Sequence, residues 1–337
     1  MDMSKVQMSY GSGGKATHDF IKKVLVKRFG NAILNDLDDS AVLKIAGRDN
    51  LAFTTDSFVV DPIFFKGGDI GKLAVCGTVN DLAVCGALPL YIACSLIIEE
   101  GFDERSLIKI LDSMATESRR AGVKIVTGDT KVVEAGSADK IFINTSGIGI
   151  VTYGKKLSIG SIRKKDKIII NGRIADHGIS VLLEREELSF KSSISSDCAS
   201  LNGVIREVLD VCPNVKFMRD PTRGGLSTTM NEIACNGRFG IRLFEERIPL
   251  GASTKAACEL LGLDPLYIGN EGKVVMVLPE READKAVSIM RGNKLGRHAA
   301  VIGEVTGDNI GRVVLRTAVG GERIVDMLTK ETLPRIC

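Results

Sequence analysis

The sequence predicts an α+β fold of two domains, and three observations support this class. The chain has 337 residues, which is too long for one ordinary hydrophobic core. Apolar residues make up 44% and charged residues 26%, the balance of a globular protein. Helical and strand periodicities mix in both halves without a regular β-α-β alternation, which favours a mixed fold over a doubly wound sheet.

The first half is expected to consist of an arm, a first helix and one mixed domain. Residues 1–36 comprise a glycine-rich arm, mobile around Gly11–Gly14, and the first helix. The domain itself covers residues 37–154. Its strands are expected at 51–55, 91–98, 124–127 and 141–151, and its helices at 70–84 and around 107–114.

The second half is expected to form another mixed domain, over residues 155–327, after a polar and basic junction at 153–166. Its helices are expected at 178–183, 201–209, 226–235, 254–261 and 281–290, and its strands at 167–170, 274–278, 299–305 and 312–315. Residues 328–337 lack apolar periodicity, so they are predicted to form a flexible, exposed tail that carries Cys337.

Composition excludes several classes of protein. A net charge of +3 and the absence of Trp argue against binding of nucleic acid or an anionic membrane. The first residues lack the features of a signal peptide, so a cytoplasmic location is expected. Residues 73–98 carry a single charge, but Asn80, Asp81 and Pro89 interrupt them, which favours a buried helix and strand over a membrane span. The eight cysteines include no CxxC pair, so reduced thiols are expected rather than a zinc site.

Carboxylates recur where apolar runs end in the first domain, and they are interpreted as lying in turns. Several such groups can converge on one hard cation that bridges phosphates, so the pattern predicts a Mg²⁺ site. A single Asp of this kind is more often a helix cap or a turn former. Four segments end in this way, at 37–39, 54–56, 79–81 and 128–129. Together they support a shared metal site and separate structural roles about equally. The predicted metal ligands are Asp38, Asp39, Asp56, Asp81 and Asp129.

Common nucleotide-binding motifs are missing. No GxxxxGK[ST] loop occurs, because Ala16 follows Gly14-Lys15. The glycine run satisfies a permissive GxGxxA pattern, but residues 5–10 are too polar for the buried strand that a dinucleotide fold requires. The segment 219–225, RDPTRGG, offers exposed backbone N–H groups and two arginines to an anion, although it also reads as an ordinary helix N-terminus.

A set of motifs, taken in order, resembles the ATP-binding superfamily of aminoimidazole ribonucleotide synthetase and selenophosphate synthetase. Within it, the likeness is strongest to the HypE family, the carbamoyl dehydratases of nickel–iron hydrogenase maturation. The resemblance covers nearly the whole chain, and the final PRIC is its most diagnostic part. The motifs are GSGGK at 11–15, FTTDSFVVDPIFF at 53–65, GTVNDLAVCGA at 77–87, VTGDTKVV at 126–133, INTSGIG at 143–149, DHG at 176–178, RDPTRGG at 219–225, NEGK at 270–273 and PRIC at 334–337.

This resemblance implies a homodimer paired through its N-terminal domains, with ATP in the cleft between the two domains of each chain and Mg²⁺ on the acidic turns. It also implies a HypF-type carbamoyltransferase that loads a carbamoyl group onto the sulfur of Cys337. ATP would then drive dehydration of the S-carboxamide to a thiocyanate. The cyanide would pass to iron on a HypC–HypD scaffold complex.

The expected site residues follow from these motifs. Cys337 is the carrier, Glu271 the expected base and Lys131 a cation that neutralises the oxygen or the phosphate; either of the last two could instead form a structural ion pair. Arg335 is expected to offset the charge of the terminal carboxylate beside the thiol. The expected nucleotide-binding residues are Gly13, Gly14, Lys15, Asp56, Asn80, Asp129, Thr130, Asp220 and Arg223.

Two other functions remain open on the sequence. A related ATP-dependent synthetase or kinase would release a soluble phosphorylated product and would have no need of Cys337. A non-catalytic ATP-binding scaffold of the maturation complex would bind the nucleotide without hydrolysing it.

Overall fold

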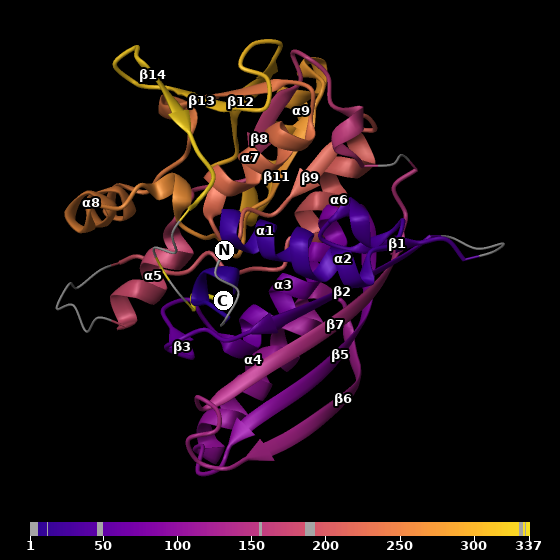
Figure 1. Cartoon of the computed structure of the whole chain (residues 1–337), viewed down its shortest axis with the longest axis vertical. Coiled ribbons are helices and arrows are strands. Elements are labelled where there is room, and N and C mark those ends of the chain that lie inside the picture. Colours follow the sequence, from indigo (N-terminus) through magenta and orange to yellow (C-terminus); the bar gives the residue numbers. More distant parts are fainter. Residues whose placement is uncertain are drawn as a thin grey trace.

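Two β-sheets and the helices packed on them make up the fold (Figure 1). The computed structural model describes residues 6–11, 13–45, 50–154, 157–185, 193–329, 333 and 335–337. Both sheets mix parallel with antiparallel strand pairs, so the α+β prediction is confirmed.

The first sheet is five-stranded over the described residues, in the order β1-β2-β7-β5-β6. Alternate residues of β7 are buried, which is the pattern of a sheet covered on one face. The covering helices are α3 (Ile70–Val84), buried on almost every side, and the amphipathic α4 (Glu104–Ala121). The strands are β1 (Ala41–Leu43), β2 (Leu51–Phe58), β5 (Ala87–Glu99), β6 (Lys124–Val133) and β7 (Ile141–Val151).

The second sheet has seven strands within the described residues, in the order β14-β13-β10-β12-β8-β11-β9. Its strands are β8 (Lys167–Ile170), β9 (Phe217–Arg219), β10 (Gly240–Phe244), β11 (Val275–Leu278), β12 (Ala300–Thr306), β13 (Val313–Arg316) and β14 (Glu322–Val325). Its helices are α5 (Asp176–Arg185), α6 (Asn202–Val211), α7 (Gly225–Asn236), α8 (Ala252–Leu261) and α9 (Glu280–Gly292). A small hairpin, β3 (Phe64–Phe65) with β4 (Gly68–Asp69), lies before α3.

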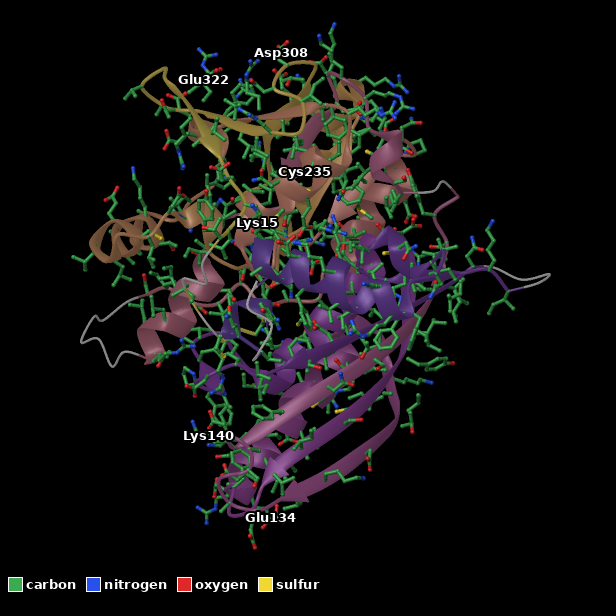
Figure 2. All side chains as sticks on the ribbon, viewed as in Figure 1. Lys15, Glu134, Lys140, Cys235, Asp308 and Glu322 are labelled. Atoms are coloured by element: carbon green, nitrogen blue, oxygen red, sulfur yellow. The ribbon has the colours of Figure 1, made fainter. Side chains whose placement is uncertain are left out.

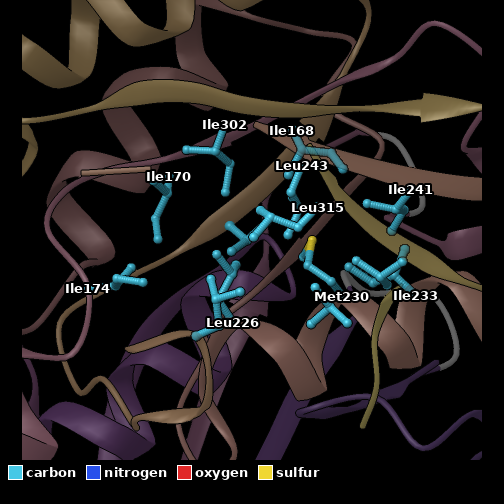
Figure 3. Close-up of a cluster of buried hydrophobic side chains, with 14 of the residues drawn as sticks. Ile168, Ile170, Ile174, Leu226, Met230, Ile233, Ile241, Leu243, Ile302 and Leu315 are labelled. Atoms are coloured by element: carbon cyan, nitrogen blue, oxygen red, sulfur yellow. The ribbon is translucent and has the colours of Figure 1, made fainter. Parts of the chain in front are cut away.

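Both faces of the second sheet are covered. Leu226 and Met230 of α7 pack on one face, against residues such as Ile168 (Figure 3). Helices α6 and α9 contribute Val204 and Met290 to a separate cluster on the other face. A sheet buried on both faces explains why β8 and β11 are almost continuously apolar.

The first helical region is longer than the sequence predicts. It runs through α1 (Lys15–Phe20), a π-helical stretch (Ile21–Val26) and α2 (Lys27–Phe29). Short 3₁₀ helices cover Met8–Gly11, Leu34–Asp36, Ile159–Ser161, Glu245–Arg247, Pro265–Tyr267 and Lys294–Gly296. No described helix combines bilayer-spanning length with sufficient hydrophobicity. All eight cysteines are unpaired.

The interpretation of the acids as turn residues is wrong for three of the four segments. Asp56 lies inside β2, Asp81 inside α3, and Asp129 inside β6, which continues well past the predicted end at residue 127. An acid after an apolar run suggests the end of an element, but a half-covered sheet carries polar residues on its open face throughout, as at Asp56 and Asp129. In α3, apolar residues continue on both sides of Asp81. Only Asp38 and Asp39 precede their strand in a bend, among the described residues.

The side chain of Asn80 links helix α3 of the first half to backbone groups of the second half. Asn80, buried on α3, donates from its amide nitrogen toward the carbonyl oxygens of Ala199 (3.1 Å) and Glu271 (3.3 Å). Its amide oxygen accepts a hydrogen bond from the N–H of Leu201 at 2.8 Å. This predicted nucleotide-binding residue therefore has its polar atoms engaged with the backbone of the second half.

We expect Asn80→Ala to lower thermal stability, because it leaves buried backbone groups of Leu201 and Ala199 without partners. A cost of about 2 kcal/mol follows from such losses, and it corresponds to a fall of several degrees in Tm. Differential scanning calorimetry measures it, with the exposed Asn35→Ala as the matched control. Equal Tm values for the two variants would show that this link contributes little.

Candidate active site

The candidate site lies where the first strands, α3, the β9–α7 turn and the tail meet. A pocket of about 360 Å³ opens there. Its lining comes from segments far apart in the sequence: Val6, Gln7, Met8, Gly11, Val59, Arg223, Gly224, Tyr267, Gly269, Leu328, Leu333, Arg335, Ile336 and Cys337.

Four aspartates form an acidic cluster beside this pocket: Asp39, Asp56, Asp81 and Asp220. Burial, and then the charges of Asp220, Asp56 and Asp39, raise the pKa of Asp81 well above its usual value. Burial also raises the pKa of Asp220, to about 8, with Asp39 adding to the shift. The hydroxyl of Thr54 lies 2.8 Å from the Asp81 carboxylate. Asp81 and Asp220 therefore bind a proton more readily than ordinary aspartates do, because burial and the neighbouring carboxylates disfavour their charged forms.

Arg219 partly offsets the acidic cluster. Its guanidinium pairs with Asp39 at 3.1 Å and with Glu232 at 2.6 Å, and it stacks 5.5 Å from the ring centre of Phe217. Glu232 in turn contacts His18 of α1 at 2.6 Å. The first helix is thus tied to the β9–α7 turn through one shared carboxylate.

Arg223 contacts the predicted carrier. Its Nε lies 2.8 Å from the Sγ of Cys337, and its Nη1 donates to the carbonyl oxygen of Gly11 at 2.7 Å. Burial raises the pKa of the Cys337 thiol to about 12, against the opposing effect of Arg223. The docked thiol is therefore protonated near neutral pH, and its nucleophilicity is low.

The described residues of the tail are packed into the molecule, so the prediction of an exposed Cys337 is wrong for this conformation. Cys337 is 7% exposed. The backbone N–H groups of Val59 and Asp61 donate to the carbonyl oxygens of Cys337 and Arg335, both at 3.1 Å. Residues 330–332 and 334 lie outside the described residues. Backbone hydrogen bonds to a distant segment produce no periodic pattern in the sequence, so the sequence does not predict this docking.

The expectation for Arg335 is also corrected. Its guanidinium pairs with Asp139 at 2.5 Å and donates to the carbonyl oxygen of Val59 at 2.8 Å. The cation beside the thiol is that of Arg223 instead.

Glu271 lies 3% exposed in the turn before β11. Burial first, and then the charges of Asp220 and Asp56, raise the pKa of its carboxyl well above the usual value, while Arg223 opposes the shift. Within the described part of the chain, no hydrogen bond is made to this carboxyl group; its backbone N–H donates to Asp197 at 3.1 Å. A carboxylate with a raised pKa is a better proton acceptor than an ordinary one.

The glycine run packs against the site rather than extending away from it. A Cβ on Gly13 would lie 2.5 Å from the Cβ of Arg223, and one on Gly14 would lie 2.3 Å from the carbonyl oxygen of Leu328. Gly13 also has φ +78°, which favours glycine. Lys15 is exposed on the surface, and only its backbone N–H, donating to Leu328 at 2.8 Å, is engaged among the contacts of the described residues (Figure 2).

Within one chain, three of the predicted site residues lie far from the acidic cluster: Asp129, Thr130 and Lys131. Asp129 on β6 pairs with Ser95 on β5, Ser95 pairs with Asn144 on β7, and Asn144 pairs with Ser57 on β2. Asp129 therefore lies three strands away from Asp56, the residue before Ser57. At about 4.8 Å per strand, the separation is roughly 14 Å. Lys131 forms an exposed ion pair with Asp129 at 2.6 Å. Asp38 is exposed as well.

The donor set fits a hard divalent cation. Carboxylate oxygens are the ligands that Mg²⁺ prefers, and the mutual repulsion of the four buried aspartates would fall if a cation lay among them. Within the described residues, no three His, Cys, Asp or Glu side chains are arranged to hold a metal ion alone. That is compatible with Mg²⁺, which usually takes one or two carboxylates together with phosphate oxygens and water.

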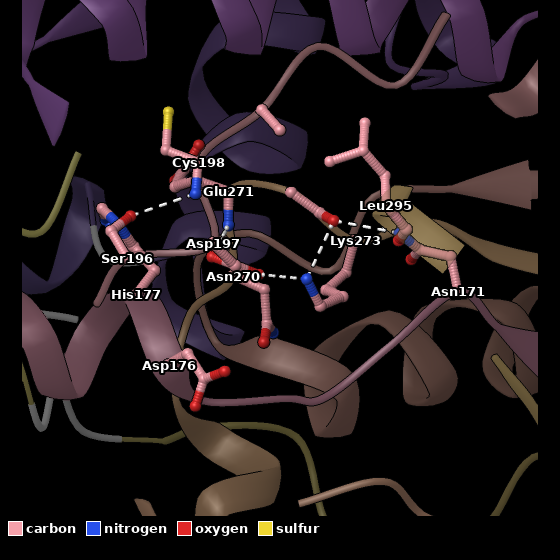
Figure 4. Close-up of polar contacts among 12 residues, drawn as sticks. Asn171, Asp176, His177, Ser196, Asp197, Cys198, Asn270, Glu271, Lys273 and Leu295 are labelled. Atoms are coloured by element: carbon pink, nitrogen blue, oxygen red, sulfur yellow. Dashed lines mark hydrogen bonds and ion pairs between the residues drawn. The ribbon is translucent and has the colours of Figure 1, made fainter. Parts of the chain in front are cut away.

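Some residues near the predicted ones were given no role by the sequence. Lys273 and His177 stand inside motifs that carried the family resemblance, NEGK and DHG, whereas Arg219 was expected only as an anion donor and is paired with two carboxylates. Asp197 belongs to none of these motifs. It is buried, pairs with Lys273 at 2.9 Å and supports the Glu271 turn (Figure 4). A lone Asp in a polar stretch gives no signal of such a partner.

Comparison with known proteins places this chain in a family. Residues 37–151 match the model of the AIR synthase related protein, N-terminal domain, and residues 163–316 that of the C-terminal domain. Carbamoyl dehydratase HypE of Cupriavidus necator is 46% identical, covering 99% of this chain and 95% of that protein.

Solved structures agree with these matches. The HypE of a HypE–HypF complex superimposes with a TM-score of 0.87 at 46% identity, covering 92% of this chain and 99% of that one. A HypE solved in complex with ATP gives a TM-score of 0.83 at 45% identity, covering 99% and 100%. The chain belongs to the HypE family of carbamoyl dehydratases.

Proposed function

We propose that this protein uses ATP to dehydrate a carbamoyl group held on the sulfur of Cys337, which yields a thiocyanate that supplies cyanide to the nickel–iron hydrogenase site. The observation that carries this proposal is the position of Cys337. Its sulfur is buried beside Arg223 and close enough to Glu271 for the two groups to influence each other's charge. Family membership and the ATP-bound relative support the nucleotide requirement.

The chemistry balances with the groups in the cleft. The amide oxygen of the S-carboxamide takes the γ-phosphoryl group of ATP, and ADP leaves. The C–O bond then breaks, phosphate departs, and the nitrogen loses its two protons, which leaves S–C≡N. Arg223 would stabilise negative charge near the reacting group. Glu271 would accept one proton from nitrogen, and the departing phosphate would take the other.

The docked position suits dehydration but not loading. A thiol with a pKa of about 12 carries almost no thiolate near neutral pH, so it would be a poor acceptor of a carbamoyl group. The tail would therefore be loaded away from the cleft, by a HypF-type carbamoyltransferase, and would return with its cargo. The HypE–HypF complex of a relative supports that partner. The cyanide would then pass to iron on a HypC–HypD complex.

The acidic cluster would hold Mg²⁺ together with the phosphates of ATP. One or two of Asp39, Asp56 and Asp81 are the proposed ligands, and phosphate oxygens and water would complete the set. Asp220, expected earlier among the nucleotide-binding residues, lies close enough to Asp81 to raise its pKa. The cation would neutralise charge that develops on the transferred phosphoryl group.

A second copy of the chain would complete the site. Every residue of the edge strand β6 except Val133 is exposed, including Val126 at 57% and Val132 at 66%. In the same sheet, Phe53 on β2 and Tyr91 on β5 are more than 40% exposed as well. An edge strand with exposed apolar residues and one unpaired edge is typical of an interface. Pairing through this strand would bring Asp129, Thr130 and Lys131 of one chain toward the cleft of the other.

We expect Glu271→Gln to accept a carbamoyl group on Cys337 but to convert it to the cyano form about 10² to 10⁴ times more slowly, since the substitution keeps the shape and removes the base. Mass spectrometry of the peptide that contains Cys337, after incubation with HypF, carbamoyl phosphate and ATP, measures both forms. Cys337→Ser serves as the blank. Normal conversion would rule out Glu271 as the base, and phosphate release from Cys337→Ser at the wild-type rate would favour a soluble-product synthetase.

Asp81→Asn should weaken Mg²⁺-dependent ATP binding by at least about tenfold, yet raise the Tm of the free protein. The sign of the second effect follows because the raised pKa of Asp81 reflects an unfavourable buried charge, which the amide removes. Calorimetric titration with and without Mg²⁺ tests the first effect, and thermal unfolding the second. Exposed Asp112→Asn is the control. Unchanged metal dependence would exclude Asp81 from the metal site.

The shared-site proposal predicts complementation. Asp129→Asn and Glu271→Gln should each impair dehydration, but a mixed dimer of the two variants should recover up to about half of the wild-type activity, because one of its two clefts then contains both native residues. Differently tagged chains, co-purified and assayed for the cyano form, provide the measurement. If the mixed dimer stays as inactive as its parents, Asp129 does not act across the interface.

A further inference from the structure

His177, in the first turn of α5, contacts the docked tail from the side opposite to residues 59–61. Its ring is fully buried and meets the ring of Phe65 edge-on, with the centroids 5.4 Å apart. Its Nε2 lies 2.7 Å from the carbonyl oxygen of Ile336, the residue next to Cys337. Its Nδ1 lies 2.8 Å from the hydroxyl oxygen of Ser196.

These contacts define which group donates and which accepts in each hydrogen bond around His177. A carbonyl oxygen only accepts, so Nε2 of His177 carries a proton and donates to Ile336. Burial lowers the pKa of His177, which keeps the ring neutral and makes Nδ1 an acceptor. The hydroxyl of Ser196 therefore donates to Nδ1, and its oxygen accepts the N–H of Cys198 at 3.1 Å.

The same short segment also supports the Glu271 turn. Asp197, between Ser196 and Cys198, accepts the backbone N–H of Glu271 at 3.1 Å and pairs with Lys273 at 2.9 Å (Figure 4). The fit is close, because a Cβ on Gly272 would lie 1.8 Å from the carbonyl oxygen of Asp197. Residues 196–198 thus connect the histidine that holds the tail with the turn that holds the proposed base.

The geometry argues against a chemical role for His177 itself. Its Nε2 faces a backbone carbonyl, and both ring nitrogens are engaged. Within the described part of the chain, His177 provides the one side-chain hydrogen bond to the backbone of Ile336. Other contacts of the tail are made one residue away, such as that of Arg185, which donates to the carbonyl oxygen of Arg335 at 3.0 Å.

We propose that His177 is a positioning residue: its hydrogen bond to Ile336 holds the carrier segment so that the sulfur of Cys337 stays between Arg223 and the Glu271 turn. The inference rests on the proposed function, because it assigns His177 to the dehydration step and not to loading. Loss of this hydrogen bond should loosen the tail without removing any group that touches the reacting atoms.

The test measures alkylation of individual cysteines by N-ethylmaleimide in the full-length protein, together with loading and dehydration. In His177→Ala, alkylation of Cys337 should be about tenfold faster, as loss of one buried hydrogen bond implies. Dehydration of the loaded protein should slow by a similar factor, and loading by HypF should not slow. Cys258, buried in the core of the second sheet, should stay as protected as in the wild type.

Three further variants separate positioning from a general loss of structure. His177→Gln should recover much of the protection of Cys337, because its side-chain amide can both donate to Ile336 and accept from Ser196. Ser196→Ala removes the hydrogen bonds of the Ser196 hydroxyl to Nδ1 of His177 and to the N–H of Cys198, but it leaves the contact of Nε2 with Ile336, so it should expose Cys337 more weakly. The exposed His298→Ala should behave as the wild type.

An unchanged alkylation rate of Cys337 in His177→Ala would overturn the proposal, even if dehydration were slow. Equal exposure of Cys337 and Cys258 would overturn it too, because it would indicate unfolding. Failure of the proposed function gives a different result. If the wild type forms no cyano group while His177→Ala still exposes Cys337 selectively, the positioning role stands and the dehydration chemistry does not.

Discussion

Burial of like charge is the constraint on which the site depends. Asp39, Asp56, Asp81 and Asp220 come from a bend, a strand, a helix and a turn, and burial raises the pKa of each. For Asp81 and Asp220, repulsion by the neighbouring aspartates adds to the shift. Such an arrangement persists only where the surrounding fold over-determines it, and the two sheets with their cores hold these residues in place.

Two arginines divide the task of offsetting this charge. Arg219 is bound on both sides by carboxylates and tied to the first helix through Glu232, so it belongs to the scaffold. Arg223, four residues on, contacts the sulfur of the carrier and one backbone carbonyl, and no carboxylate pairs with it among the described residues. Its charge therefore remains available to a reacting group. One motif thus supplies an arginine that is paired with carboxylates and another that contacts the sulfur of Cys337.

The sequence predicted the fold more completely than the site, for physical reasons. Buried helices and strands such as 70–84 and 167–170 have strong periodicity or apolar runs, and they were located closely. Strands β1, β9, β10 and β14 were missed, because they are short or carry charged residues such as Arg242 and Glu322. The site depends on long-range contacts. Family motifs pointed to Arg223 and Glu271, but nothing local indicated that Asn80 bonds to backbone or that Asp197 pairs with Lys273.

The docking of the tail also has a consequence for the timing of biosynthesis. Arg335 donates to Val59, 276 residues earlier in the chain. At about 10 residues per second, a ribosome needs roughly half a minute to add the intervening length. During that interval the first sheet can fold around α3, but its side of the cleft stays open to water. A nascent chain that has not yet reached Arg335 thus holds a hydrated cleft, and residues 335–337 close it once they have been made.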